Sequence, residues 1–248
     1  IKGERGLAVM IGSIDCMHWG WKNLPTAWKG QYQGRNGEAS TVLEAIASQD
    51  LWIWHSFFGL PGTCNDLTVL YRSPVFDDLL NGRAPTVKYM VNGHEYNTPY
   101  YLTDGIYPNW STFVKSLPLP QTPKEMLFAK RQESTRKDVE RAFGVLQARF
   151  AVLRYPALTW DENMLQKIMT TCIILHNMIV EDERHLYASY ADPSQYNNET
   201  EEGETLVQTS EHAVEYTNEV QEYILNRTHL EDGSVHRSLR EDLMEHIW

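Results

Sequence analysis

The feature that most constrains the fold is a change in the spacing of apolar residues along the chain. Before residue 124, apolar residues occur in short runs bounded by turn residues, a pattern typical of buried strands. These runs are Leu7–Ile14, Thr41–Ala47, Leu51–Phe58 and Tyr100–Thr103. Later the apolar residues fall at helical spacing over Arg136–Phe150, and a second long apolar helix is indicated that ends at about Val180. Strands followed by long helices predict an α/β fold, a mixed sheet flanked by helices.

The charge is divided unevenly between two parts of the 248-residue chain. Residues 1–180 contain 18 Lys and Arg against 16 Asp and Glu, whereas residues 181–248 contain 4 against 17. Segment 190–208 is rich in Ser, Asn, Glu and Thr, a composition typical of disorder, and Leu239–Trp248 regains an amphipathic pattern. We therefore predict a folded domain over 1–184 and an acidic, largely disordered tail over 185–248. Disorder is expected over 190–235, and the tail ends in a short amphipathic helix.

The sequence lacks the features that several classes of protein require. No apolar run approaches the ~20 residues of a membrane span. Cys16, Cys64 and Cys172 are far apart and form no CxxC pair, which argues against a disulfide scaffold and a zinc ribbon. There is no GxxxxGK[ST] phosphate loop, no GxSxG turn and no HExxH. Because the chain begins with Ile, we expect it to be a fragment.

Three acids suggest chemistry when they are considered together. Asp15 and Asp104 each follow an apolar run, and Glu140 lies in the predicted helix Arg136–Phe150. Each alone has an ordinary explanation: a turn cap for either Asp, a surface charge for Glu140. Two strand ends and a helix packed beside them can, however, gather three carboxylates, and such a cluster is costly unless a cation neutralises it. Oxygen ligands suit Mg²⁺ or Mn²⁺.

Several motifs occur together and in order between about Gly12 and Arg184. They are IDCMHW, AWKGQYQGRNG, LWIWHSFFGLPGTCNDLTVL, VNGHEYN, YYLTDGIYP, FAKRQESTRKDVERAFG and IILHNMIVEDER. In these motifs the chain resembles the DDE domain of PIF/Harbinger transposases, and within them the plant transposon-derived branch and its domesticated relatives. The resemblance implies a ribonuclease H-like mixed sheet of about five strands flanked by helices.

The same resemblance implies a function and a set of site residues. The catalytic and metal-binding acids fall on Asp15, Asp104 and Glu140, which would hold two Mg²⁺ or Mn²⁺ ions and cleave DNA in the nucleus, with the cytoplasm as a second location. A Myb-like or chromatin-associated partner and a homo-oligomer are further expectations. The alternative is a domesticated nuclear protein that no longer cleaves DNA and acts through protein contacts in a chromatin complex. The N-terminal helix-turn-helix region usual in the family is missing from this chain.

Other residues carry two interpretations each. Asp66 and His18 are candidates for supporting the metal site, although Asp66 is also a plausible helix N-cap and His18 a packed or solvent-edge histidine. Basic residues concentrate around Glu140, either as a solvated helix face or as contacts to DNA phosphates. These residues are Lys130, Arg131, Arg136, Lys137, Arg141, Arg149 and Arg154. His176, on an apolar helix, is expected to be a hydrogen-bonded core residue and not a ligand.

One further group mixes aromatic and basic residues and can either pack as a hairpin or stack on unpaired bases. Its aromatic members are Trp19, Trp21, Trp28 and Tyr32.

Overall fold

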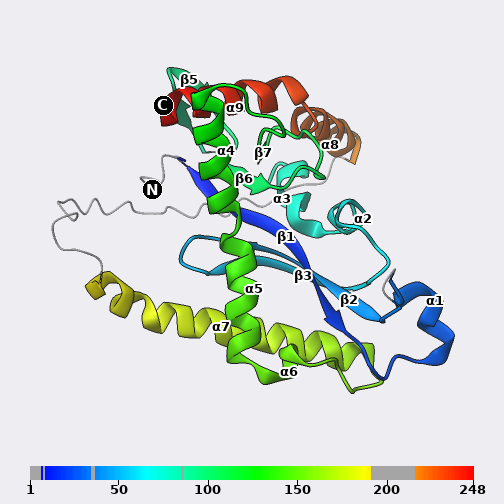
Figure 1. The fold of residues 1–248 in the computed structure, drawn as a ribbon. Coiled ribbons are helices and arrows are strands. Elements are labelled where there is room, and N and C mark those ends of the chain that lie inside the picture. Colours follow the sequence, from blue (N-terminus) through cyan, green and yellow to red (C-terminus); the bar gives the residue numbers. More distant parts are fainter. Residues whose placement is uncertain (1–6, 8, 35–36, 85–86, 191–215) are drawn as a thin grey trace.

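The computed structural model describes residue 7 and residues 9–34, 37–84, 87–190 and 216–248 (Figure 1). For residues 185–190 and 216–220 it describes the backbone only. The predicted disorder of segment 191–215 lies outside the described residues. Within the described part, no helix is both long and apolar enough to cross a lipid bilayer.

A five-stranded mixed sheet forms the centre of the molecule, in the order β3-β2-β1-β6-β7. β1 is antiparallel to β2, β2 is antiparallel to β3, and β1, β6 and β7 are parallel to one another. The strands are β1 (Met10–Gly20), β2 (Ser40–Ala47), β3 (Ile53–Pro61), β6 (Tyr100–Thr103) and β7 (Phe113–Lys115). A separate hairpin consists of β4 (Tyr89–Val91) and β5 (His94–Tyr96). The predicted fold class, a mixed sheet flanked by helices, is confirmed.

The first strand is longer than its apolar pattern indicates. The predicted run ended at Ile14, but β1 continues to Gly20 because residues 13–20 pair along the whole length of β2. Asp15 therefore lies within a strand and not at its end, so the turn-cap interpretation of Asp15 is wrong. The three-residue strands β4, β5 and β7 were not predicted, since so few residues leave no recognisable periodicity.

Helices cover both faces of the sheet (Figure 1). One face carries α5 (Asp138–Arg149) and α7 (Glu162–Tyr190), with α4 (Pro123–Arg136) leading into α5 and the short α6 (Ala151–Arg154) following it. The other face carries α2 (Asp66–Leu70) and α3 (Asp77–Leu80). A further single turn, α1 (Lys29–Tyr32), follows β1.

Alternation along β1 divides the core between these faces. Met17 packs with the apolar residues of α5 and α7, whereas Ile14 packs with Leu70 of α2 and with Phe76. Because neighbouring side chains of a strand point to opposite faces, Ser13 and Asp15 share the face of Met17. Cys16 and His18 lie on the face of Ile14. This alternation decides which helix each polar residue of β1 meets.

The C-terminal helices differ from the expected tail. Segment 216–230 forms α8 (Tyr216–Leu230), and α9 (Gly233–Ile247) follows, so disorder extending to residue 235 is wrong for the described part. Leu239 and Leu243 of α9 are 1% and 0% exposed and pack with Leu102 and Phe128 of the main domain. The predicted amphipathic helix exists, but it is part of the core and not an appendage.

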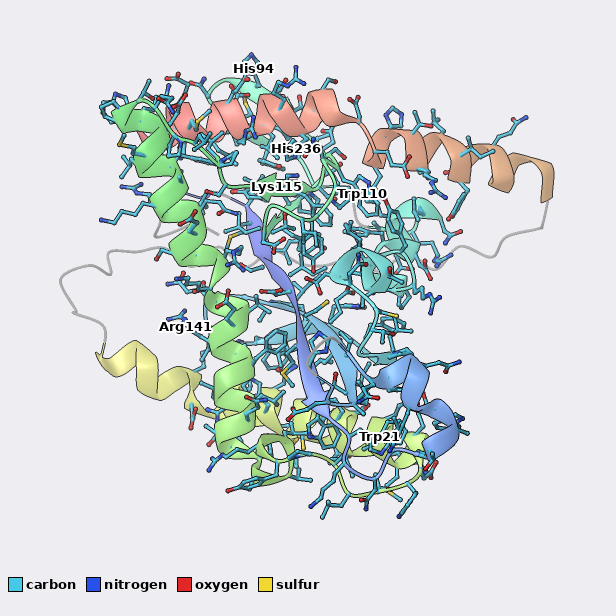
Figure 2. All side chains as sticks on the ribbon, turned by 45° about the vertical axis from the view of Figure 1, so that its right-hand side comes forward. Trp21, His94, Trp110, Lys115, Arg141 and His236 are labelled. Carbon is cyan, nitrogen blue, oxygen red and sulfur yellow. The ribbon has the colours of Figure 1, made fainter. Side chains whose placement is uncertain are left out.

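Polar contacts hold α9 in place at both of its sides. Asp242 accepts hydrogen bonds from the Nδ1–H of His94 at 2.8 Å and from the hydroxyl of Tyr96, both on the β4–β5 hairpin. His236 Nδ1 lies 2.7 Å from the backbone oxygen of Phe113 in β7. Figure 2 shows His94 and His236 next to α9.

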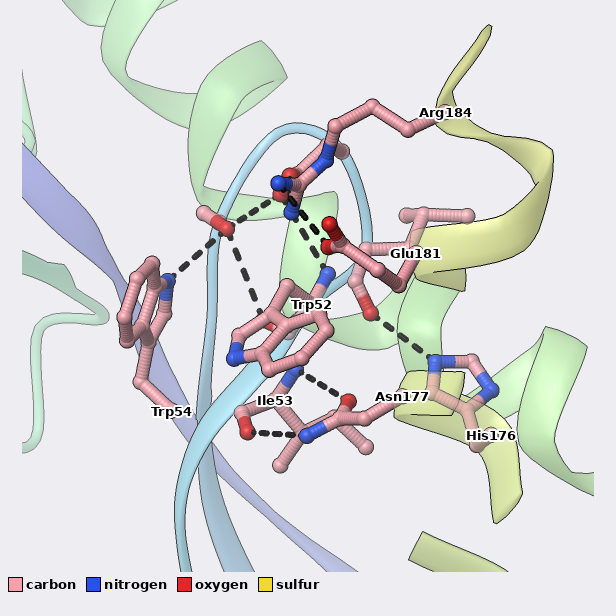
Figure 3. Close-up of polar contacts among 10 residues, drawn as sticks. Trp52, Ile53, Trp54, His176, Asn177, Glu181 and Arg184 are labelled. Carbon is pink, nitrogen blue, oxygen red and sulfur yellow. Dashed lines mark hydrogen bonds and ion pairs between the residues drawn. The ribbon is translucent and has the colours of Figure 1, made fainter. Parts of the chain in front are cut away.

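His176 and Asn177 connect α7 to the edge strand β3 (Figure 3). Asn177 accepts a hydrogen bond from the backbone N–H of Ile53 at 2.9 Å and donates one to its carbonyl oxygen at 2.8 Å. His176 is fully buried, and its Nε2–H donates to the backbone oxygen of Leu51 at 2.9 Å. Burial lowers the pKa of His176, as does the nearby charge of Arg149. The core interpretation of His176 is confirmed.

The aromatic residues near the end of β1 pack mainly against one another. Trp21 lies with its ring centroid 5.2 Å from that of Tyr32 and 6.0 Å from that of Trp28. Trp19, Trp21 and Tyr32 are buried, and only Trp28 is exposed. This arrangement favours packing over stacking on bases.

Candidate metal and nucleic-acid site

Asp15 presents its carboxylate to the junction between α4 and α5. Ser13, two residues earlier on the same face, donates a hydrogen bond from Oγ to the backbone oxygen of Thr135 at 3.2 Å. Asp15 Oδ1 accepts the backbone N–H of Cys16 at 2.8 Å, and the side chain is only 17% exposed. The strand therefore holds a largely buried acid against the end of α4.

Asp104 directly follows β6, the parallel strand next to β1, and its charge acts on Asp15. Ser13 of β1 is aligned with Leu102 of β6, so the same register continued by two residues aligns Asp15 with Asp104. Neighbouring strands lie about 4.8 Å apart. Asp104 Oδ1 also accepts the backbone N–H of Ile106 at 2.9 Å, so this acid caps its turn as well as standing next to Asp15.

Glu140 reaches the site through Arg136. One nitrogen of the Arg136 guanidinium, Nη1, lies 3.2 Å from Asp15 Oδ2 and 2.9 Å from Glu140 Oε1. The two carboxylate oxygens therefore cannot be farther apart than these two distances together. Arg136 ends α4 and Glu140 lies in the first turn of α5, so the junction between the helices places both residues over β1.

The raised pKa of Asp15 reflects its burial first and the neighbouring carboxylates second. Burial raises the pKa of Asp15 to about 6, against the lowering effects of the Cys16 N–H and of Arg136, and the carboxylates of Asp66 and Asp104 raise it further. Burial also raises the pKa of Asp66, and the charge of Asp104 adds to this. Holding these acids ionised near pH 7 thus has a free-energy cost that a nearby cation offsets.

The donor set fits a hard divalent cation. All of the converging side chains supply carboxylate oxygens, which Mg²⁺ and Mn²⁺ prefer, and Arg136 shows that this place already accommodates a positive charge. In the described ranges, no three His, Cys, Asp or Glu side chains are arranged closely enough to form a ligand group as they stand. The Arg136 guanidinium lies between Asp15 and Glu140.

Comparison with known families identifies the chain. Residues 1–187 match a family model described as "Plant transposon protein". The chain belongs to the plant transposon protein family. This match covers all the elements that build the acid cluster, and it confirms the resemblance to transposon-derived proteins at the level of the family.

Two curated relatives of this plant transposon protein are similar to it over the same region. "Protein ALP1-like" of Arabidopsis thaliana is 27% identical over 186 residues, covering 72% of this chain and 45% of the relative. "Putative nuclease HARBI1" of Mus musculus is 24% identical over 189 residues, covering 75% and 50%. The chain thus spans about half the length of these relatives. No solved structure matches it.

The two residues predicted to support the site lie on the other face of the sheet. His18 is exposed, and its Nδ1 is 3.1 Å from Ser40 Oγ; as a residue three positions after Asp15 it points away from α5. Asp66 is not the N-cap of α2, because Asn65 takes that role by accepting the backbone N–H of Thr68 at 2.9 Å. Of the two, Asp66 is the one that acts on Asp15 through its charge.

The basic residues of this plant transposon protein divide into two groups. Arg149 forms an ion pair with Glu183 of α7 and contacts His176, so it joins two helices instead of facing solvent. Arg154 donates to the backbone oxygen of Ala148 at 3.0 Å. On the α4–α5 surface near the acids, exposed or partly exposed basic side chains remain. They are Lys130, Arg131, Lys137 and Arg141. Arg141, labelled on α5 in Figure 2, is 53% exposed although it also pairs with Asp138 at 2.6 Å.

Two residues that hold the second acid in place were missed by sequence reasoning. Gln132 of α4 is fully buried and donates from Nε2 to the backbone oxygens of Thr103 at 3.0 Å and Val114 at 3.1 Å. Lys115, labelled in Figure 2, donates from Nζ to the backbone oxygen of Tyr107 at 2.9 Å, across the loop after Asp104. Both act on backbone carbonyls, and a sequence contains no signal for such contacts.

Proposed function

We propose that this chain is the catalytic domain of a metal-dependent, transposon-derived DNA nuclease or transposase. The observation that carries the proposal is the meeting of Asp15 and Glu140 at one guanidinium nitrogen, with Asp104 aligned beside Asp15. Asp15 in β1 is 17% exposed and Glu140 in α5 is 46% exposed, and Asp104 directly follows β6, the strand next to β1. Membership of the plant transposon protein family and similarity to a relative named a nuclease support the same reaction class.

In this proposal Asp15, Asp104 and Glu140 would hold two Mg²⁺ or Mn²⁺ ions. Such a pair of ions supplies activation of a water or a 3′-hydroxyl and stabilisation of the leaving oxygen of a phosphodiester. The chain's own contribution is rigidity: β1 and β6 fix the two Asp residues, and Gln132 holds α4 to the strand end before Asp104.

The remaining basic residues bind the DNA backbone in this proposal. Lys130, Arg131, Lys137 and Arg141 lie along the helices that carry Arg136 and Glu140. Contacts from such side chains to phosphates add affinity and position the duplex without reading its sequence. A DNA substrate implies action in the nucleus, and a Myb-like or chromatin-associated partner would supply sequence selectivity.

A second candidate is a protein that keeps the fold without cleaving DNA and works through protein contacts. The observation that favours it is Arg136, which already offsets part of the charge of Asp15 and Glu140 from within the chain. Because an internal cation already contacts two of the acids, their proximity alone does not require a metal or catalysis.

A cleavage assay with matched variants separates the two candidates. We would incubate the chain with linear duplex DNA and Mn²⁺, compare it with Asp104→Asn and Glu140→Gln, and measure Mn²⁺ binding by calorimetry. The control is Asp161→Asn, since Asp161 also accepts a backbone N–H two residues ahead, at 3.0 Å, in a turn before α7.

Catalysis predicts that Asp104→Asn and Glu140→Gln abolish cleavage and weaken Mn²⁺ binding while Asp161→Asn does neither. Equal cleavage by the wild type and Asp104→Asn would refute the catalytic proposal. Mn²⁺ binding that depends on Asp104, with no cleavage by any variant, would favour the second candidate.

A further inference from the structure

The solvent-facing side of α7 carries an apolar stripe that nothing in the described part of the chain covers. Ile174, Leu175 and Met178 are 55%, 41% and 60% exposed. The opposite side of the same helix supplies Leu165, Met169 and other residues to the core. A helix that is apolar on its outer side as well as its inner side indicates a partner surface.

The stripe has a symmetric spacing along the helix. Between Lys167 and Asp182 its members are Lys167, Thr171, Ile174, Leu175, Met178 and Asp182, all exposed, and Met164, which is 44% exposed, lies on the same side about one turn earlier. Successive members are four, three, one, three and four positions apart, so the spacing is the same in both directions. At 100° per residue all six fall on one side of the helix. From Lys167 to Asp182 the stripe is about 22 Å long, at 1.5 Å per residue.

We infer that this stripe binds a second copy of the chain, with the two α7 helices antiparallel about a two-fold axis between Ile174 and Leu175. Reversing the stripe places Ile174 against Leu175 of the other copy and Thr171 against Met178. It also places Lys167 against Asp182 at both ends. A two-fold interface requires a surface that is complementary to itself. In this arrangement apolar residues of the stripe face apolar residues of the other copy, and each Lys167 faces an Asp182.

The charges are what favour a second copy over an unrelated protein. An apolar stripe alone fits many partners. A stripe with a basic residue at one end and an acidic residue at the other is complementary to a second copy of itself that runs antiparallel to it. This inference does not depend on the proposed catalysis, because α7 lies on β3, which β2 and β1 separate from β6 and Asp104.

Measurement of mass in solution with a charge-reversal series tests the inference. Sedimentation equilibrium of the full chain would be compared across Ile174→Glu, Lys167→Asp, Asp182→Lys and the double variant Lys167→Asp with Asp182→Lys. Met126→Glu, at a 53% exposed apolar position on α4, is the control. Thermal melting followed by circular dichroism verifies that each variant is folded.

We expect a dimer for the wild type and for Met126→Glu, and a monomer for Ile174→Glu. Each single charge reversal should weaken association by about tenfold, because each places two like-charged pairs in the dimer. The double reversal should restore the wild-type dissociation constant, since it exchanges the charges at positions 167 and 182 and so brings back an opposite-charge pair at each end of the interface. A monomeric wild type would overturn the inference, as would a dimer that Ile174→Glu leaves intact or a double reversal that fails to rescue association.

Discussion

The clearest physical consequence of the acid cluster is that replacing Asp15 with Asn should stabilise the fold in a pH-dependent way. The pKa of Asp15 is about 6 in the folded chain against an ordinary value of 3.8. A carboxyl with a raised pKa holds its proton more tightly when folded, so its stability contribution is present below pH 3.8 and is lost as pH rises through about 6. One pKa unit corresponds to about 1.4 kcal/mol, so the ionised Asp15 costs about 3 kcal/mol at pH 7.

The assay is urea unfolding of the wild type and Asp15→Asn between pH 4.5 and 7.5. Titrations common to both proteins cancel in the difference between their unfolding free energies. The variant should gain most of the 3 kcal/mol across this range, approaching that figure above pH 7. Saturating Mn²⁺ should then stabilise the wild type and not the variant, because a ligand that binds only the folded state shifts the equilibrium towards it.

A difference in unfolding free energy that stays constant from pH 4.5 to 7.5 would refute the reasoning. It would mean that Asp15 titrates alike in the folded and unfolded chains, and hence that neither burial nor the neighbouring carboxylates raise its pKa. Asp161→Asn, in an exposed turn, is the matched control for the chemical change from carboxylate to amide.

Three further predictions follow from particular contacts. Leu243→Ala should lower the unfolding free energy by about 2–5 kcal/mol, whereas Leu225→Ala, at a 56% exposed position, should change it by less than about 0.5 kcal/mol; thermal melting compares the two. Arg141→Gln should weaken DNA binding and reduce the slope of log affinity against log salt by about one, while Arg149→Gln leaves that slope unchanged, as fluorescence anisotropy over a salt series would show. Gln132→Met removes the side-chain amide that donates hydrogen bonds to two buried backbone carbonyls. It should lower the free energy of unfolding, measured in urea, by about 1–3 kcal/mol.

The local pattern of residues was sufficient to predict the main elements. Apolar runs marked β2, β3 and β6, and helical spacing marked α5 and α7, because burial on one or both faces imposes a period on the sequence. The acids were found in the same way, as polar residues at the boundaries of apolar elements. Their meeting was an inference from topology, and the parallel register of β1 and β6 supports it.

Long-range pairing decided features that no local pattern indicates. The extension of β1 past Asp15 depends on β2, which begins 25 residues after that acid. Arg136 and Arg149 belong to the same basic stretch of sequence. One bridges two acids of the site and the other joins α5 to α7, because each meets a different neighbour in space.

The sequence by itself determined the order of strands and helices, the family and the three acids, since each is set by residue type and spacing along the chain. Only the tertiary structure decided that Arg136 stands between two of those acids, that Gln132 holds the strand end, and that α9 completes the core. The physical reason is that ion pairs, buried hydrogen bonds and packing depend on residues far apart in the chain. Which partner each residue meets is settled only when the whole fold forms.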